Sequence, residues 1–239
     1  MKIHPKLYGI SSLLVLGLTL AVYLAACSGA NPGKSNTEGV IVYEVSFPFD
    51  QDNPYINIFP KEMTFTFKKN KIRAKLASFA EVVCSEFIID NTNKRFEQYF
   101  KVFDEKYHLQ LDEEGVQQMI GLMPNLELHT TTELDSLAGL ICAKSLANFI
   151  DRSAQPIVLY HTPTIGIRSP NWYNQFSELN DVLLAYEIEQ FGKRMRLEAK
   201  EIRYEEVSDD KFILPEGYES VSFTEMHSKI EDLVAQFDK

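Results

Sequence analysis

The amino-acid sequence predicts a mainly β (α+β) fold, built as a single curved antiparallel sheet or partial barrel with a few helices on its concave side. From Val40 onward, apolar residues alternate with more polar ones at a period of two, which is typical of strands with one buried face. The strand-like segments are short and are joined by polar turns without helices between them. This arrangement favours an antiparallel meander over parallel βαβ units.

Four strands are expected before residue 91. The alternating apolar residues of the first three are Ile41, Tyr43, Val45 and Phe47, then Met63, Phe65 and Phe67, then Ile72, Ala74 and Leu76. Asn70-Lys71 predicts a tight turn before the third strand, and Asp90-Asn91-Thr92-Asn93 predicts a turn after a fourth strand over 83–89.

The remaining strands are predicted at 95–103, 106–111, 126–131, 141–149, 157–162, 182–190, 193–205 and 211–214. A helix is expected over 112–123, because acidic residues open it and Gly121 and Pro124 stand near its end. Ser169-Pro170 predicts the start of a second, short helix. A last helix is expected from Ser222, which forms a capping box with Glu225.

The N-terminus has the order of a secretory signal. Lys2 and Lys6 precede an apolar run, which ends at Leu24-Ala25-Ala26-Cys27. This ending resembles the lipobox of bacterial lipoproteins, and the resemblance implies cleavage before Cys27, acylation of that cysteine and a lipid anchor. A transmembrane helix over 7–26 is the alternative. Ser28, rather than Asp, follows Cys27, which by the lipoprotein sorting rule implies the outer membrane, with the body facing the periplasm.

Three parts of the chain are therefore expected. Residues 1–26 form the lipoprotein signal peptide, 27–38 the acylated cysteine and a flexible polar tether, and 39–239 a single β-rich domain. The formal net charge of −10 argues against nucleic acid as a partner, because an acidic surface repels phosphate backbones. The expected partner is the membrane.

Cys84 and Cys142 lie on apolar strand-like segments. An oxidising compartment would allow a disulfide between them, and the alternative is two separate buried thiols. Neither has a His or a second Cys at ligand spacing, so no metal site is expected, and no cofactor fingerprint occurs.

No catalytic motif stands in the sequence, so we expect no enzyme. The histidines beyond the leader, His108, His129, His161 and His227, stand singly. His161, between Tyr160 and Thr162 on an expected strand, is the best candidate for a general base, and a local structural hydrogen bond is its alternative role. Catalysis would require His161 to meet acidic residues in an open cleft.

Three segments carry a family resemblance. They are Glu38–Val45 (EGVIVYEV), Ala138–Lys144 (AGLICAK, against a pattern AGYxCKK) and Phe212–Tyr218 (FILPEGY, against F.LPxGY). In these the chain resembles uncharacterised bacterial envelope proteins related to the lipoprotein carriers LolA and LolB. The resemblance implies a LolA-like curved sheet and no catalytic residue.

Two functions follow from a concave apolar sheet. In the first, a non-enzymatic LolA/LolB-like protein binds an apolar ligand, a lipid or a lipoprotein acyl chain, and Phe65, Phe67, Phe87 and Leu109 line the hollow. In the second, a structural or interaction lipoprotein of an outer-membrane complex binds other envelope proteins, and these side chains fill the core so that no small ligand is bound.

The lipid anchor is testable at Cys27. Cys27→Ala should leave the chain uncleaved or soluble, because lipid attachment needs the thiol and stable anchoring needs more than one acyl chain. Cell fractionation and the mass of the mature chain measure this. Unchanged processing together with membrane retention would contradict the lipobox.

Overall fold

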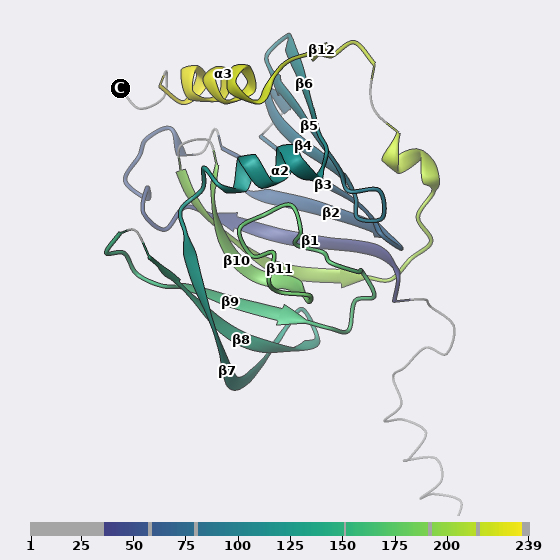
Figure 1. Ribbon diagram of the computed structural model, residues 1–239, viewed down its shortest axis with the longest axis vertical. Coiled ribbons are helices and arrows are strands. Elements are labelled where there is room, and N and C mark those ends of the chain that lie inside the picture. Colours follow the sequence, from purple (N-terminus) through teal and green to yellow (C-terminus); the bar gives the residue numbers. More distant parts are fainter. Residues whose placement is uncertain are drawn as a thin grey trace, which may run out of the picture. The chain divides into compact units, whose positions relative to one another are not determined.

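Twelve strands form one sheet in the described part of the chain, which comprises residues 36–56, 59–78, 81–150, 152–190, 193–213 and 216–235 of the computed structural model (Figure 1). The predicted signal peptide, Cys27 and the tether up to residue 35 lie outside the described residues. The spatial order is β12-β6-β5-β4-β3-β2-β1-β11-β10-β9-β8-β7. The sheet is not closed into a barrel, which confirms the predicted mainly β fold with one curved sheet.

The strands are β1 Glu38–Ser46, β2 Glu62–Lys68, β3 Lys71–Ala77, β4 Val83–Asp90, β5 Arg95–Val102, β6 Glu105–Leu111, β7 Leu126–Leu137, β8 Leu140–Phe149, β9 Ile157–Thr162, β10 Val182–Gln190, β11 Lys193–Arg203 and β12 Glu219–Ser220. Neighbouring strands are antiparallel, except that β12 runs parallel to β6. The long strand β7 is the edge of the sheet opposite β12, and its pairing with β8 is irregular between Thr130 and Leu134.

Because the strands alternate in direction, their connections gather at two ends of the sheet. We call the end where β1 begins, at Glu38, the entry end, and the opposite end, where β1 stops at Ser46, the distal end. The distal end holds the described residues of the connections 47–61, 78–82, 103–104, 121–125 and 150–156, together with the end of β10 and the start of β11. The entry end holds the other turns and the long connection 163–181.

The strand register places the predicted inward residues on one face. Ile41, Phe65, Ala74, Phe87, Gln98 and Leu109 form a single row across β1 to β6. Phe67 lies in the next row, which runs through Ile72, Ile89 and Phe96. These rows belong to the main hydrophobic core. The four residues predicted to line the concave side therefore share that face.

A helix and a long loop cover the concave face. Helix α2, Glu113–Ile120, begins at Asp112, whose carboxylate accepts the Gly115 N–H at 2.9 Å, and it buries Val116 and Met119 in the main core. This confirms the helix predicted over 112–123. The loop 163–181 contributes Ile165, Ile167, Trp172, Phe176 and Leu179, all buried, and crosses in front of β10 and β11 (Figure 1).

The helix predicted from Ser169-Pro170 is wrong, because this segment forms turns. Two asparagines bind the backbone there: Asn174 accepts the Phe176 N–H, and Asn171 donates to the carbonyls of Leu179 and Asp181. Such side chains offer the backbone an alternative to helical hydrogen bonds. The Ser169-Pro170 pair therefore precedes a series of turns and not a helix.

The chain after β11 crosses the outer face of the sheet. Lys68 donates to the Val207 carbonyl and Arg73 to the Lys211 carbonyl, both at 2.7 Å. These bonds replace a strand ladder, so the strand predicted over 211–214 is wrong: residues 209–212 form the short 3-10 helix η3. Beyond β12, helix α3, Phe223–Ala235, begins at the predicted capping box, in which Ser222 N–H donates to Glu225 at 2.7 Å and Glu225 N–H to Ser222 Oγ at 3.3 Å.

We predict that Phe67→Ala lowers the free energy of unfolding by about 3–5 kcal/mol, because the fully buried ring would leave a cavity in a packed core. Ile213→Ala, at an exposed position, is the control and should change it by less than about 0.5 kcal/mol. Urea unfolding of both variants measures the difference. A loss at Phe67 as small as that at Ile213 would contradict a filled interior.

Candidate functional site

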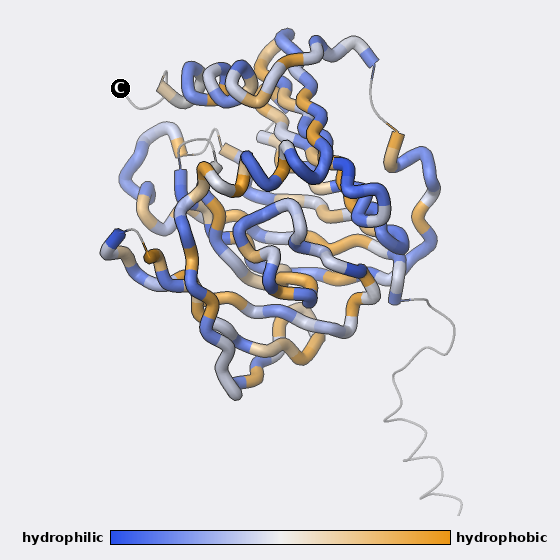
Figure 2. The backbone as a smooth tube through the Cα atoms, viewed as in Figure 1, coloured by the Kyte–Doolittle hydropathy of each residue, from blue (hydrophilic) through white to orange (hydrophobic). Residues whose placement is uncertain are grey.

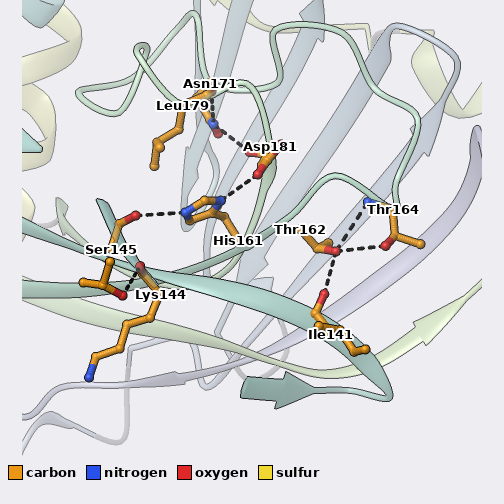
Figure 3. A network of polar contacts seen from close by, with 10 residues as sticks. Ile141, Lys144, Ser145, His161, Thr162, Thr164, Asn171, Leu179 and Asp181 are labelled. Atoms are coloured by element: carbon orange, nitrogen blue, oxygen red, sulfur yellow. Dashed lines mark hydrogen bonds and ion pairs between the residues drawn. The ribbon is translucent and has the colours of Figure 1, made fainter. Parts of the chain in front are cut away.

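The strand register brings His161 close to Ser145. His161 on β9 is paired with Ala143 of β8 and with Leu183 of β10, and Ser145 lies on the same face of β8, two residues from Ala143. The loop 163–181 then delivers Asp181 to the other side of the imidazole, directly before β10 begins. Three elements thus meet at one histidine (Figure 3).

The contacts follow the order of a Ser–His–Asp triad. Ser145 Oγ lies 2.9 Å from His161 Nε2, and His161 Nδ1 lies 2.7 Å from Asp181 Oδ2 (Figure 3). An ionised carboxylate can only accept, so Nδ1 carries the proton and donates to Asp181. With neutral imidazole, Nε2 then accepts the hydroxyl proton of Ser145. This tautomer satisfies all three side chains at once.

The Ser145–His161–Asp181 network is largely buried. Ser145 is fully buried and His161 is 6% exposed. Ser145 also sits within a strand that has neighbours on both sides, paired with Thr130 of β7 and Leu159 of β9. Acyl transfer needs a nucleophile that substrate can reach and free N–H groups for the developing oxyanion. The acidic partner of His161 is present, but the open cleft that catalysis requires is not formed around it.

The network's physical role is to fasten the loop 163–181 to the sheet. Asn171, which is buried, donates from Nδ2 to the carbonyls of Leu179, at 2.7 Å, and Asp181, at 2.9 Å, and so fixes the backbone that carries the carboxylate (Figure 3). Further along the loop, Trp172 Nε1 donates to Asn91 Oδ1 in the β4–β5 turn at 2.9 Å. Sequence reasoning found His161 but missed Ser145, Asp181 and Asn171, because no spacing in the chain links them.

Loop 163–181 is also tied to the start of β1. Asn36 Nδ2 donates to the Thr164 carbonyl at 2.7 Å, and the Gly166 N–H donates to the Asn36 carbonyl at 3.0 Å. The loop therefore contacts the first described residues of the chain, the β4–β5 turn and the β8–β9 face. Movement of the loop would require all three attachments to break together.

The concave side has little space beside the predicted lining residues. Phe67 is 0%, Leu109 2% and Phe65 5% exposed, and Phe87 is partly buried against the same core. Side chains around a hollow that holds an acyl chain would keep accessible surface. One small hollow lies instead at the distal end, next to Phe149, Ile157 and Arg194, and its volume of about 10 Å³ suits one water molecule.

Cys84 and Cys142 are separate, buried thiols, on β4 and β8, rather than the bonded pair that the sequence left open. Burial raises the pKa of Cys84 to about 11, and burial near Asp135 raises the pKa of Cys142. Both thiols are therefore protonated at neutral pH and are poor nucleophiles.

A second polar cluster lies on the outer face of the sheet and was not found from the sequence. Glu97, 4% exposed, contacts Arg95 at 2.5 Å, Tyr99 at 2.5 Å and His108 at 3.1 Å. Burial, followed by the hydrogen bond to Glu97, raises the pKa of Tyr99, and Tyr218 packs its ring edge-on against Tyr99. The side chains of this cluster contact one another, and Tyr218 of the C-terminal segment packs against it. Its only sequence signal is the i, i+2 spacing of residues 95, 97 and 99.

Comparisons with known proteins give the fold alone. No family model matches the chain, and no curated protein matches it. Two solved structures of PNGF-II, in the P21 and C2 space groups, are similar, with TM-scores of 0.53 and 0.52 at 14% sequence identity. The matches cover 81% and 84% of this chain but 33% of PNGF-II in each case, so the chain spans about one third of that protein's length.

The described residues contain no group of three His, Cys, Asp or Glu side chains placed to hold a metal ion. Within those same ranges, the helices are too short or too polar to cross a bilayer.

We predict that His161→Ala loosens the loop 163–181, because it leaves the Ser145 hydroxyl and the Asp181 carboxylate without their shared partner. The expected cost is about 1–3 kcal/mol of unfolding free energy. Trp172, the single tryptophan of the chain, reports on the loop through a red shift of its fluorescence. His129→Ala, on the exposed strand β7, is the matched control. A native emission spectrum and stability for His161→Ala would contradict the fastening role.

Proposed function

We propose that the chain is a non-enzymatic lipoprotein of the bacterial outer membrane, held by an acylated Cys27 and facing the periplasm. Its folded body acts as an interaction module and not as a carrier of an apolar small molecule. Cys27 lies outside the described residues, so the anchor rests on the lipobox at Leu24–Cys27. The fold of the body agrees with the curved sheet that the resemblance to LolA-like envelope proteins implies, and membership of that group is part of the proposal.

The observation that carries the proposal is the burial of the concave face. Phe65, Phe67 and Leu109 are at most 5% exposed, and the chain's own helix α2 and loop 163–181 contribute apolar side chains to the same core. A carrier needs a preformed apolar hollow of several hundred cubic ångströms. In this body the chain itself occupies the corresponding position, which favours a filled core over a ligand site.

The absence of catalysis is proposed on the same physical ground. The best-placed nucleophile, Ser145, is buried beneath the loop that His161 and Asp181 hold in place. Exposing Ser145 would require loop 163–181 to move away, and this movement would remove Asp181 from His161. The three side chains therefore cannot keep their contacts while Ser145 is open to substrate. The likeness to PNGF-II concerns the fold and adds no activity to the proposal.

Native mass spectrometry of the body, purified without detergent, tests the filled core. We expect a single mass equal to that of the polypeptide and no binding of a fluorescent fatty acid, because no hollow is available to an acyl chain. A protein with a known fatty-acid site is the positive control for the assay. Phe67→Ala removes a single ring and leaves far less space than an acyl chain needs, so this variant should stay free of fatty acid as well. Fatty acid bound stoichiometrically to the unaltered body would overturn the proposal in favour of an apolar-ligand carrier.

A further inference from the structure

The distal end of the sheet collects exposed apolar side chains. Nine large apolar side chains are exposed in the described residues, and six of them stand on distal connections, with exposures between 36% and 74%. They are Phe49, Tyr55, Val82, Phe103, Leu122 and Ile150. Single exposed apolar residues are ordinary on protein surfaces, but their concentration at one end of an antiparallel sheet is not a consequence of the fold. The opposite, entry end carries two, Leu134 and Ile141.

Several of these connections contact one another. The Phe103 N–H donates to the Val82 carbonyl at 2.8 Å, which joins the β5–β6 turn to the connection before β4. The Ile150 N–H donates to the Asn125 carbonyl at 3.0 Å, which joins the connection after β8 to the one before β7. Arg194 then lies over both the Phe49 ring, at 4.9 Å, and the Phe149 ring, at 5.2 Å. These hydrogen bonds and ring contacts hold in place the connections that carry the exposed apolar side chains.

Phe103 supplies an independent argument. Its φ angle is 50°, in the left-handed region, where a bulky side chain is strained and Gly or Asn is preferred. Its ring is also 59% exposed, so packing does not compensate for the strain. Five other non-glycine residues of the described chain have φ angles between 45° and 54°, so this turn conformation is not particular to Phe103. What is particular to Phe103 is that the turn holds a large apolar ring exposed, where it is open to a contact outside the folded body.

The charged residues at the distal end favour contact with a partner surface that carries no net charge. Lys193 pairs with Asp50 at 3.1 Å, Arg194 with Glu187 at 2.6 Å, and Arg152 with Glu189. These pairs neutralise three cations that would attract anionic headgroups. Lys61, Lys101 and Lys106 lie on or beside the same connections and are offset by Asp52, Asp104 and Glu105. Anionic lipid should therefore not strengthen contact with a membrane.

From these observations we infer that the distal end docks onto an uncharged lipid surface, with the six apolar tips inserted at the headgroup level. The inference rests on the proposed membrane anchor, which would supply the nearby bilayer. The six exposed apolar side chains stand on separate connections. Such an arrangement fits the broad apolar layer of a membrane better than a single pocket in a protein partner.

Vesicle co-sedimentation tests this docking with the body from Ser35 onward, which lacks Cys27. That segment is one compact unit and contains both hydrophobic clusters, so it folds without the anchor. We expect it to bind phosphatidylcholine vesicles, and added phosphatidylglycerol should not increase the binding. The double variant Leu122→Ser/Ile150→Ser should bind at least about tenfold more weakly, since each loses apolar surface that inserts.

The matched control is Leu134→Ser/Ile141→Ser, which removes equally exposed apolar side chains from the entry end and should bind as the unaltered body does. Phe103→Asn separates function from stability: it should weaken vesicle binding while its melting temperature stays the same or rises, because Asn fits the left-handed turn.

Three outcomes would overturn the inference. They are no vesicle binding by the unaltered body, an equal loss in the entry-end control, or a dimer in analytical ultracentrifugation that the distal variants abolish, which would make the occupant a second copy. None of these depends on Cys27. A failure of the anchor would appear separately, in the fractionation of Cys27→Ala.

Discussion

The inner face of β1 to β6 is mostly apolar along its cross-strand rows, with Ser85 and Gln98 as buried polar exceptions, and an open sheet cannot bury such a face by itself. This requirement determines the rest of the architecture. Helix α2 and the loop 163–181 both lie over the concave side, and their apolar side chains join the same cores. Burial of this face supplies most of the folding free energy, since apolar area removed from water is the main favourable term.

A loop that covers a sheet has buried backbone N–H and C=O groups, and these groups need hydrogen-bond partners. In this chain, asparagine and histidine side chains make many of the hydrogen bonds that hold the loop. Asn171 binds two carbonyls of its own loop, Asn36 and Asn91 hold the loop to neighbouring segments, and His161 links Ser145 to Asp181. A Ser–His–Asp series of hydrogen bonds is therefore compatible with a purely structural role.

The period-two pattern was sufficient to predict the fold class and the face that holds Phe65, Phe67, Phe87 and Leu109. The helix start and stop residues were sufficient to predict the two helices that follow Asp112 and Ser222. These features depend on local patterns, which a sequence displays directly. The segment from Ser169 was misassigned because a Ser-Pro pair can precede either a helix or a turn, and hydrogen bonds from the side chains of Asn171 and Asn174 to the backbone stabilise turns here. The strand expected at 211–214 failed for a similar reason, since the contacts with Lys68 and Arg73 come from far along the chain.

The His161 network could not be predicted at all, because Ser145, His161 and Asp181 meet only through the register of three strands and the path of a loop. The close packing of the concave side could not be predicted from the sequence either. Alternation gives the direction of a side chain but not the volume that other segments leave free beside it. The distal apolar residues were visible in the sequence, yet their grouping depends on which turns share an end of the sheet.

The two edges of the sheet differ in a way that bears on self-association. At one edge β12 and helix α3 adjoin β6, while β7 ends the sheet at the other. A free edge strand can recruit a neighbouring chain, which is the first step of fibril growth. Strand β7 carries Glu127, Glu133 and Asp135, and its ladder is interrupted between Thr130 and Leu134. Two of these acids are paired, Glu127 with His129 and Glu133 with Lys144, so the interrupted ladder is the feature that disfavours edge-to-edge association of crowded molecules through β7.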